Sequence, residues 1–356
     1  GVSCILITNN SLKGNTMLDT HNISDVMGTG HILPETHVHK NLLDLSLFDF
    51  GVEEVPLHYF HTNQDGVEIE HSAPKKKAIV RSDSGEFLGN HSDRYKTVPH
   101  YGLYKQHAER IAEVIPTNNI EIIDQTWDNG AKARRTVHFL DQTVAVKDGD
   151  IVNLRSDVFN SLDGSWAFQT FTGAYRSLCL NTLVFGGQSM YQEKRKHTGG
   201  LSIAGALSKI GNSIDIFANQ GEQFKKWSNT KLDDKQVAHV LGQTVCFKKS
   251  KTIELQDLKT GDIDLRNTNT RLSDYLLYRY EQEQGMLGKT LWALYNAVTH
   301  WSTHTDETYE SMNDKGELKE ISMGRKGSQK ANVQKEREIK VREMLDSPYW
   351  KQLEVA

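Results

Sequence analysis

Three short turn signals in the middle of this 356-residue chain restrict its fold more than any other feature. Asp128-Asn129-Gly130, Asp148-Gly149 and Asp163-Gly164 each separate runs that are rich in β-branched and aromatic residues. Asn-Gly and Asp-Gly pairs favour the positive φ angles of the tight turns that join antiparallel strands. Their spacing therefore predicts a four-stranded antiparallel meander over residues 120–171.

The remaining patterns predict an α+β fold with helices packed on one face of this meander. A hairpin is expected over residues 77–89 and a helix over 101–115, which ends before Pro116. TGAYRSLCLNTLVF, residues 172–185, suits a helix that packs across the sheet. Further helices are expected from residue 201 onward, and the strongest pattern covers 271–301. We expect a partly helical acidic lead-in at 1–50, a main domain at 51–305, and a polar linker with a terminal helix at 306–356.

Charge is distributed unevenly along the chain, although the formal net charge is only −4. Residues 1–70 contain ten acidic and two basic residues, whereas residues 71–260 contain 26 basic and 20 acidic ones. A basic patch matters more for nucleic-acid binding than the total charge, so this class of partner stays open. The three widely spaced cysteines form neither a disulfide framework nor a zinc pattern. No apolar run is long enough for a membrane span, and a reducing cytoplasm is expected.

The basic residues give the most specific functional hypothesis. Alternation along the second meander strand places Arg134 and His138 on one face and Arg135 on the other, and Arg155 and Asp157 share a side of the next strand. Cations on a solvated sheet face would neutralise phosphates and release counterions. We predict phosphate contacts from a leading set, Lys132, Arg134, Arg135, Arg155 and Arg176, and from a second set, Lys75, Lys76, Lys77, Lys194, Arg195 and Lys196.

Ordinary structural explanations compete with this hypothesis. Antiparallel sheets often have one solvated face, lysines protect edge strands, and Trp166 and Phe168 are typical core residues. The early histidines could in principle hold a metal together with a carboxylate, but no HExxH motif is present and solvated histidines are the simpler explanation. The histidines concerned are His31, His37, His39, His58, His61 and His71. Walker A, GxGxxG and GxSxG motifs are also missing, so no nucleotide cofactor, metal or catalytic residue is predicted.

Three segments of the chain resemble the phage/plasmid-like protein family of unknown function. In that family a DG-x-x-A-F strand leads to an R-x-x-C-x-N helix, and a LYNA-T helix lies near the C-terminus. The similarity covers roughly residues 50–305. The matching residues here are Asp163, Gly164, Ala167 and Phe168, then Arg176, Cys179 and Asn181, then Leu294, Tyr295, Asn296, Ala297 and Thr299.

That family is in turn remotely similar to single-strand annealing recombinases of the Redβ/RecT/Erf type. The resemblance implies a β-β-β-α core that assembles as rings or filaments on single-stranded DNA. It also implies a phage or mobile-element origin, a bacterial cytoplasmic location, and non-covalent annealing during recombination. Two alternatives stay open at this stage: a metal-dependent nuclease that uses the early histidines and acidic residues, and a host-interaction or anti-defence protein.

Overall fold

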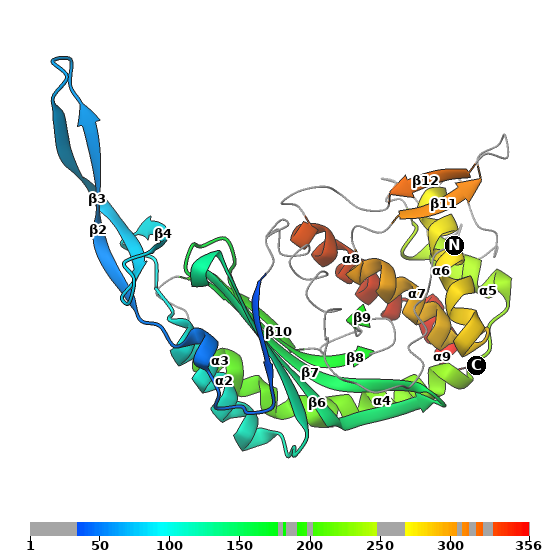
Figure 1. Cartoon of the computed structure of the whole chain (residues 1–356). Helices are drawn as coiled ribbons and strands as arrows, with labels where there is room; N and C mark the ends of the chain where they lie inside the picture. The colour runs from blue at the N-terminus through cyan, green and yellow to red at the C-terminus, as the bar shows by residue number, and fades with distance from the viewer. Residues whose placement is uncertain are drawn as a thin grey trace.

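The computed structural model describes residues 34–176, 181–182, 191–197, 202–247, 268–304, 308–312, 318–322 and 330–355. The N-terminal half consists mainly of antiparallel sheet and the C-terminal part is mostly helical (Figure 1). This is the α+β class that the sequence predicts. His31, Cys4 and Cys179 lie outside the described residues.

The predicted meander forms the centre of the main sheet. Its strand order is β1-β5-β6-β7-β8-β10, and the short β9 also pairs with β8. Gly149 and Gly164 adopt φ angles of +77° and +75°, the conformations that the Asp-Gly turns require. The strands are β1 (Glu35–His39), β5 (Ile120–Trp127), β6 (Lys132–Lys147), β7 (Asp150–Ser161), β8 (Phe168–Arg176), β9 (Asn181–Thr182) and β10 (Tyr191–Arg195).

The helix predicted over residues 172–185 is wrong in its described part. β8 continues through Arg176 and pairs with β7, with Thr172 opposite Ser156 and Arg176 opposite Val152. All five residues from Thr172 to Arg176 are buried, so this segment carries no burial pattern of its own, and its pairing with β7 decides that it is a strand. The acidic lead-in is also not helical where it is described, apart from the single turn η1 (Ser46–Phe48), because β1 joins the sheet beside β5.

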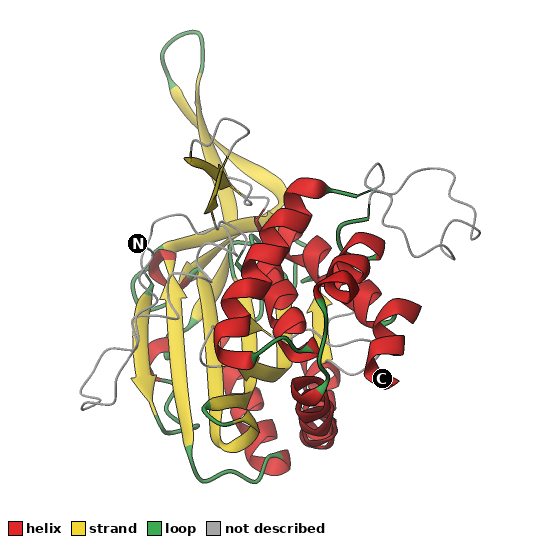
Figure 2. Cartoon of the chain, turned by 90° about the vertical axis from the view of Figure 1, so that its right-hand side faces the viewer, coloured by secondary structure: helices red, strands yellow, loops and turns green. Residues whose placement is uncertain are grey.

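A second sheet forms a long hairpin that projects from the body of the molecule (Figures 1 and 2). It contains β2 (Val52–Thr62), β3 (Glu68–Arg81) and β4 (Phe87–Ser92), in the order β2-β3-β4. The hairpin predicted over residues 77–89 is the β3–β4 connection, in which the Arg81 amide donates to the Glu86 carbonyl at 2.9 Å. β4 pairs only with the part of β3 nearest the body, so the outer part of the hairpin is two-stranded.

Helices cover one face of the main sheet and continue into the C-terminal part (Figure 1). The helix predicted over 101–115 is α2. The segment predicted as helical over 271–301 is two helices, α6 and α7, because Gly288 adopts a φ of +72° and ends α6. The helices are α2 (His100–Val114), α3 (Ile203–Leu207), α4 (Ser213–Asn229), α5 (Asp234–Gln243), α6 (Thr270–Leu287), α7 (Leu291–Thr303), α8 (Lys330–Leu345) and α9 (Pro348–Val355), with single turns η2 (Asp128–Gly130) and η3 (Ser208–Asn212).

The polar linker predicted from residue 306 includes a short hairpin of β11 (Thr308–Met312) and β12 (Leu318–Ser322). Within the described part of the chain, no helix is long and apolar enough to cross a membrane.

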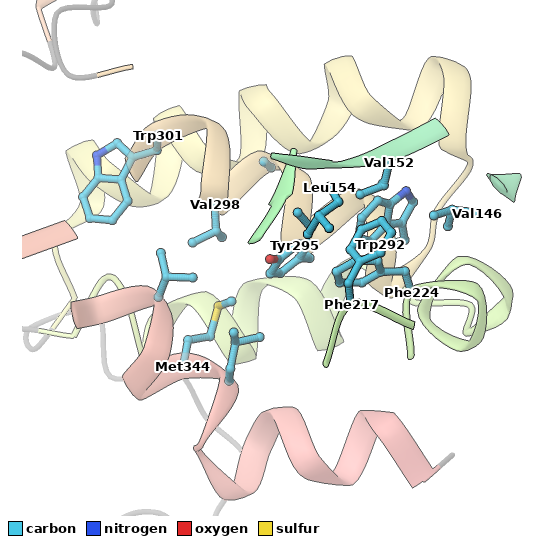
Figure 3. Packing of buried hydrophobic residues seen from close by; sticks show 14 of the residues in the cluster. Val146, Val152, Leu154, Phe217, Phe224, Trp292, Tyr295, Val298, Trp301 and Met344 are labelled. Atoms are coloured by element: carbon cyan, nitrogen blue, oxygen red, sulfur yellow. The ribbon is translucent and has the colours of Figure 1, made fainter. Parts of the chain in front are cut away.

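The main core lies where α4, α7 and α8 meet the end of the sheet (Figure 3). Trp292 of α7 is fully buried against Phe224 of α4, with ring centroids 4.8 Å apart. α4 can approach β6 closely because Gly221 has no side chain; a Cβ there would lie 2.5 Å from the Val144 side chain. This packing fixes one end of the sheet and leaves the projecting hairpin at the other.

Candidate nucleic-acid interface

The structure buries the four arginines that the sequence proposes as the leading phosphate contacts. Their exposed fractions are only 0–5%, and each pairs with a carboxylate of the same chain. They do not line an open positive furrow, which is what the sequence-based hypothesis required. The four are Arg134, Arg135, Arg155 and Arg176.

Asp157 of β7 is the centre of the first buried cluster. Arg134 donates to its Oδ1 from Nη2 at 2.8 Å, and Arg155 donates to its Oδ2 from Nε at 2.6 Å. The Thr136 hydroxyl donates to the same carboxylate at 2.6 Å. Burial, the largest single influence, favours the neutral acid, but the two guanidinium groups outweigh it and lower the pKa of Asp157 to about 2. Both guanidinium groups are therefore held by one buried carboxylate of the same chain and do not face solvent.

Arg135 lies on the opposite face of β6, as the alternation predicts. Its Nε is 3.2 Å from Asp124 Oδ1, its Nη2 donates to the Asp44 carbonyl, and His39 Nε2 lies 2.9 Å from Asp124 Oδ2. Burial lowers the pKa of Arg135 and raises that of Asp124, although each partner opposes the shift of the other. This group ties β1 to the central strands β5 and β6.

Arg176 connects the sheet to the C-terminal helices. Its Nε donates to Asp150 Oδ1 at 2.6 Å, its Nη1 donates to Glu283 of α6 at 3.0 Å, and Trp292 donates to Asp150 Oδ2 at 2.6 Å. Lys132, the remaining member of the leading set, pairs with Asp128 and lies 3.5 Å from Asp163, and its side chain is 14% exposed. Each member of the leading set therefore has a structural role in this chain.

Two parts of the second set converge at the base of the projecting hairpin, although they are far apart in sequence. The Asp93 amide donates to the Lys75 carbonyl, and the Lys96 amide donates to the His197 carbonyl, both at 3.2 Å. These bonds connect three chain segments, around residues 75, 94 and 196, which together carry five exposed cations. We call them the junction surface: Lys75, Lys76, Arg94, Lys96 and Lys196.

The junction surface keeps a positive charge because its own carboxylates are few. Lys75, Lys76, Arg94 and Lys196 form no ion pair with any carboxylate among the described residues, and Asp93 is the acid within the loop itself. Lys77 differs from its two neighbours, because its ammonium group donates to Glu54 at 2.7 Å and to the Tyr95 carbonyl at 2.8 Å. Lys194 and Arg195 lie on β10, but their side chains are outside the described part of the structure.

A stack of three rings holds the junction surface together. Tyr95 lies between His91 and His197, with ring centroids 3.6 and 5.0 Å away and interplanar angles of 6° and 13°. The Tyr95 hydroxyl donates to the Ser161 carbonyl of β7, and burial raises the pKa of this phenol. Both faces of the Tyr95 ring are occupied, so its role is to fix the loop against the sheet and not to stack on a base.

Sequence reasoning missed Arg94 and Lys96. The one available signal was their position directly after the predicted hairpin, in the stretch HSDRYK that also contains Tyr95. Their proximity to Lys196 depends on a contact between segments about a hundred residues apart in the chain, which no local pattern contains.

The early histidines have partners that do not form a metal centre. His39 pairs with Asp124, His58 pairs with Glu70 at 2.9 Å, and the ring of His71 stacks on that of Tyr59. Among the described residues, no group of three or more His, Cys, Asp or Glu side chains is arranged to hold a metal ion. Cys246 is a buried thiol without a disulfide, and burial raises its pKa to about 12.

Comparison with known protein families gives one match. Residues 87–339 match the family described as "Domain of unknown function (DUF932)". The chain belongs to this family. No curated protein and no solved structure gives a significant match. The DUF932 match begins at Phe87, so it includes Arg94, Lys96 and Lys196 of the junction surface but not the strands β2 and β3.

Proposed function

We propose that this DUF932 protein binds single-stranded nucleic acid at the junction surface and needs no nucleotide cofactor to do so. One observation carries the proposal: five exposed cations from three separate segments are held together by backbone hydrogen bonds. Cations arranged in this way neutralise successive phosphates and release condensed counterions. The buried arginines of the main sheet stabilise the fold and do not contact the ligand in this proposal.

The proposed contact is to the nucleic-acid backbone and leaves base edges exposed. Lysine and arginine side chains that bind phosphate carry no sequence information, so the affinity should depend little on base sequence. A strand held by its phosphates can still pair with a complementary strand. The family resemblance adds the biological context to this proposal: a phage or mobile-element protein that anneals single-stranded DNA during recombination.

The salt dependence of binding provides a quantitative expectation. Each neutralised phosphate of a single strand contributes a slope of about −0.7 to the plot of log affinity against log salt. Five contacts therefore give a slope of about −3.5. Over a fourfold rise in salt concentration the affinity should fall by about a hundredfold.

The experiment is fluorescence anisotropy with labelled oligonucleotides, single- and double-stranded, across a salt series. A junction variant that combines Lys75→Gln, Lys76→Gln and Arg94→Gln should reduce the steepness of the salt slope by about 2. The control variant neutralises three exposed lysines elsewhere, each of which pairs with an acid of its own chain: Lys225→Gln, Lys289→Gln and Lys351→Gln. Equal charge is removed in both variants, so a difference between them isolates the junction surface.

An unchanged slope in the junction variant would refute the proposed contact. A parallel incubation with Mg²⁺, with and without a chelator, tests the nuclease alternative on the same oligonucleotides. Chelator-sensitive cleavage would favour the enzyme, whereas intact oligonucleotides with faster annealing of complementary strands would favour the binding protein.

A further inference from the structure

The outer part of the projecting hairpin has no structural partner among the described residues. We call it the distal arm, residues 58–72, in which β2 and β3 pair only with each other: His58 is opposite Ser72, and Thr62 is opposite Glu68. Figures 1 and 2 show that it extends away from the body of the molecule. An isolated two-stranded hairpin is marginally stable in water, so a partner would stabilise this one.

A break in strand pairing separates the distal arm from its base. The register passes from Pro56 opposite Lys77 to His58 opposite Ser72, so residues 73–76 form an irregularity in β3 opposite Leu57. Lys75 lies in it with a φ of +60°, in the left-handed region. Beyond this point both faces of the ribbon are open to solvent. Irregularities of this kind bend a strand and change its direction. Here the bend in β3 lies where β4 stops pairing with it.

Exposed apolar side chains mark the distal arm as a contact surface. Tyr59 and Phe60 are 53% and 62% exposed, and Val67 and Ile69 near the tip are 55% and 40% exposed. Aromatic side chains of this kind are enriched at protein interfaces and are costly to leave in water. They occur on both faces of the ribbon, because adjacent residues alternate.

The charge of the distal arm identifies the chemistry of its partner. It contains three acids, Asp65, Glu68 and Glu70, and no lysine or arginine. A phosphate polymer would be repelled, so the arm is not an extension of the proposed nucleic-acid site. A basic protein surface is the complementary partner. This chain provides one at the base of the same hairpin, where the junction surface carries five cations and one acid.

We propose that the distal arm of one molecule docks on the junction surface of a second copy of this chain. Within one molecule the arm begins at the junction surface and extends away from it, so the contact joins two copies (Figure 1). Two arrangements satisfy this contact: a closed pair in which each arm docks on the junction surface of the other copy, and a head-to-tail chain in which each copy that accepts an arm still presents its own. A docked arm covers the cations that the proposed function assigns to nucleic acid, so the two ligands compete for the junction surface. Self-association does not require nucleic acid and goes beyond the proposed function.

Charge reversal on each side provides the test, measured by sedimentation velocity at low salt without nucleic acid. The arm variant combines Glu68→Lys with Glu70→Lys, and the junction variant combines Lys76→Glu with Arg94→Glu. Each should weaken self-association by about tenfold or more, because like charges then face each other. The control variant, Glu222→Lys, reverses an acid whose side chain is 75% exposed on α4, and should self-associate as the unmodified chain does.

Complementation decides whether the two surfaces contact each other. A mixture of the arm variant and the junction variant should associate, because the reversed arm of one meets the reversed junction of the other. The chain that carries all four substitutions should also self-associate, which in addition shows that the substitutions do not prevent folding.

Four outcomes would overturn the proposal: an unmodified chain that remains monomeric at every concentration, an arm variant that associates normally, a junction variant that associates normally, or no recovery in the mixture. Oligonucleotide binding by the arm variant separates this proposal from the proposed function. If nucleic acid binds the junction surface, the arm variant should retain that binding whether or not it self-associates.

Discussion

Replacing Asp157 by asparagine should destabilise this protein far more than neutralising an acid on its surface. Asp157 is about 1% exposed and accepts hydrogen bonds from Arg134, Arg155 and Thr136. Asparagine keeps the shape of the side chain but removes the charge, and its amide group is a donor that would face guanidinium donors. Arg134 and Arg155 would then both lose the carboxylate that they share.

The magnitude follows from the pKa of Asp157. Its pKa falls from the ordinary value of 3.8 to about 2, so the structure favours the carboxylate over the neutral acid by about 2 kcal/mol. Asparagine resembles the neutral acid and adds a misplaced donor, so this figure is a lower bound. Breaking a buried ion pair by removing one partner costs about 3–5 kcal/mol. The expected loss of unfolding free energy therefore lies at about 3–5 kcal/mol.

Urea unfolding followed by tryptophan fluorescence and circular dichroism measures this loss directly. The matched control is Glu222→Gln on α4, which breaks an exposed pair with Lys225 and should change the stability by no more than about 0.5 kcal/mol. If Asp157→Asn were as stable as the unmodified chain, the arginines would not depend on their carboxylate. The structural role that we assign to Asp157 would then be wrong.

Three further outcomes are expected. His100 and His107 lie on the buried face of α2, and burial lowers their pKa values to about 4 and about 3. The unfolded chain therefore binds more protons below pH 6.5, and the free energy of unfolding should fall by about 2 kcal/mol per histidine between pH 7.5 and pH 5. Urea unfolding at each pH measures this fall, and a constant stability would contradict burial of neutral rings. Gly221→Ala should lower the free energy of unfolding by about 1–3 kcal/mol, because the new Cβ would lie 2.5 Å from the stiff Val144 side chain. A gain in melting temperature would contradict the close approach of α4 to β6. Lys75→Asn should reduce the steepness of the oligonucleotide salt slope by about 0.7, because one cation is lost. The free energy of unfolding should not fall, because asparagine tolerates the φ of +60° at this position better than lysine. A salt slope equal to that of the unmodified chain would remove Lys75 from the interface.

Local chemistry explains which parts of the fold the sequence predicts correctly. The meander over residues 120–171 depends on glycines at 149 and 164 that reach positive φ within their own turns, without help from distant contacts. The error at residues 172–185 has the opposite origin. TGAYRSLCLNTLVF has apolar residues at spacings compatible with a helix, but the partner that extends β8 through Arg176 is β7, which supplies a ladder of hydrogen bonds from outside the segment.

The leading site residues show a different limit of sequence reasoning. Alternation places Arg155 and Asp157 on the same side of one strand, so a carboxylate near the arginines was already visible in the sequence. What alternation does not give is the register between β6 and β7, which sets Thr136 opposite Asp157 and brings Arg134 to the same carboxylate. A basic residue on a strand therefore predicts a phosphate contact only when no acid lies opposite or diagonal to it on the neighbouring strand.

The three consecutive lysines at 75–77 show how one local irregularity divides like residues between two roles. Lys77 lies on the regular side of the break in β3, where its ammonium group is held by Glu54 and by the Tyr95 carbonyl, and it secures the base of the hairpin. Lys75 and Lys76 lie within the irregular segment, are exposed and face no described carboxylate. The break that frees these two charges is also the point where the ribbon becomes acidic and two-stranded. A positive junction surface and an acidic arm therefore arise on either side of the same backbone feature, and any change that restores regular pairing at residues 73–76 should alter both.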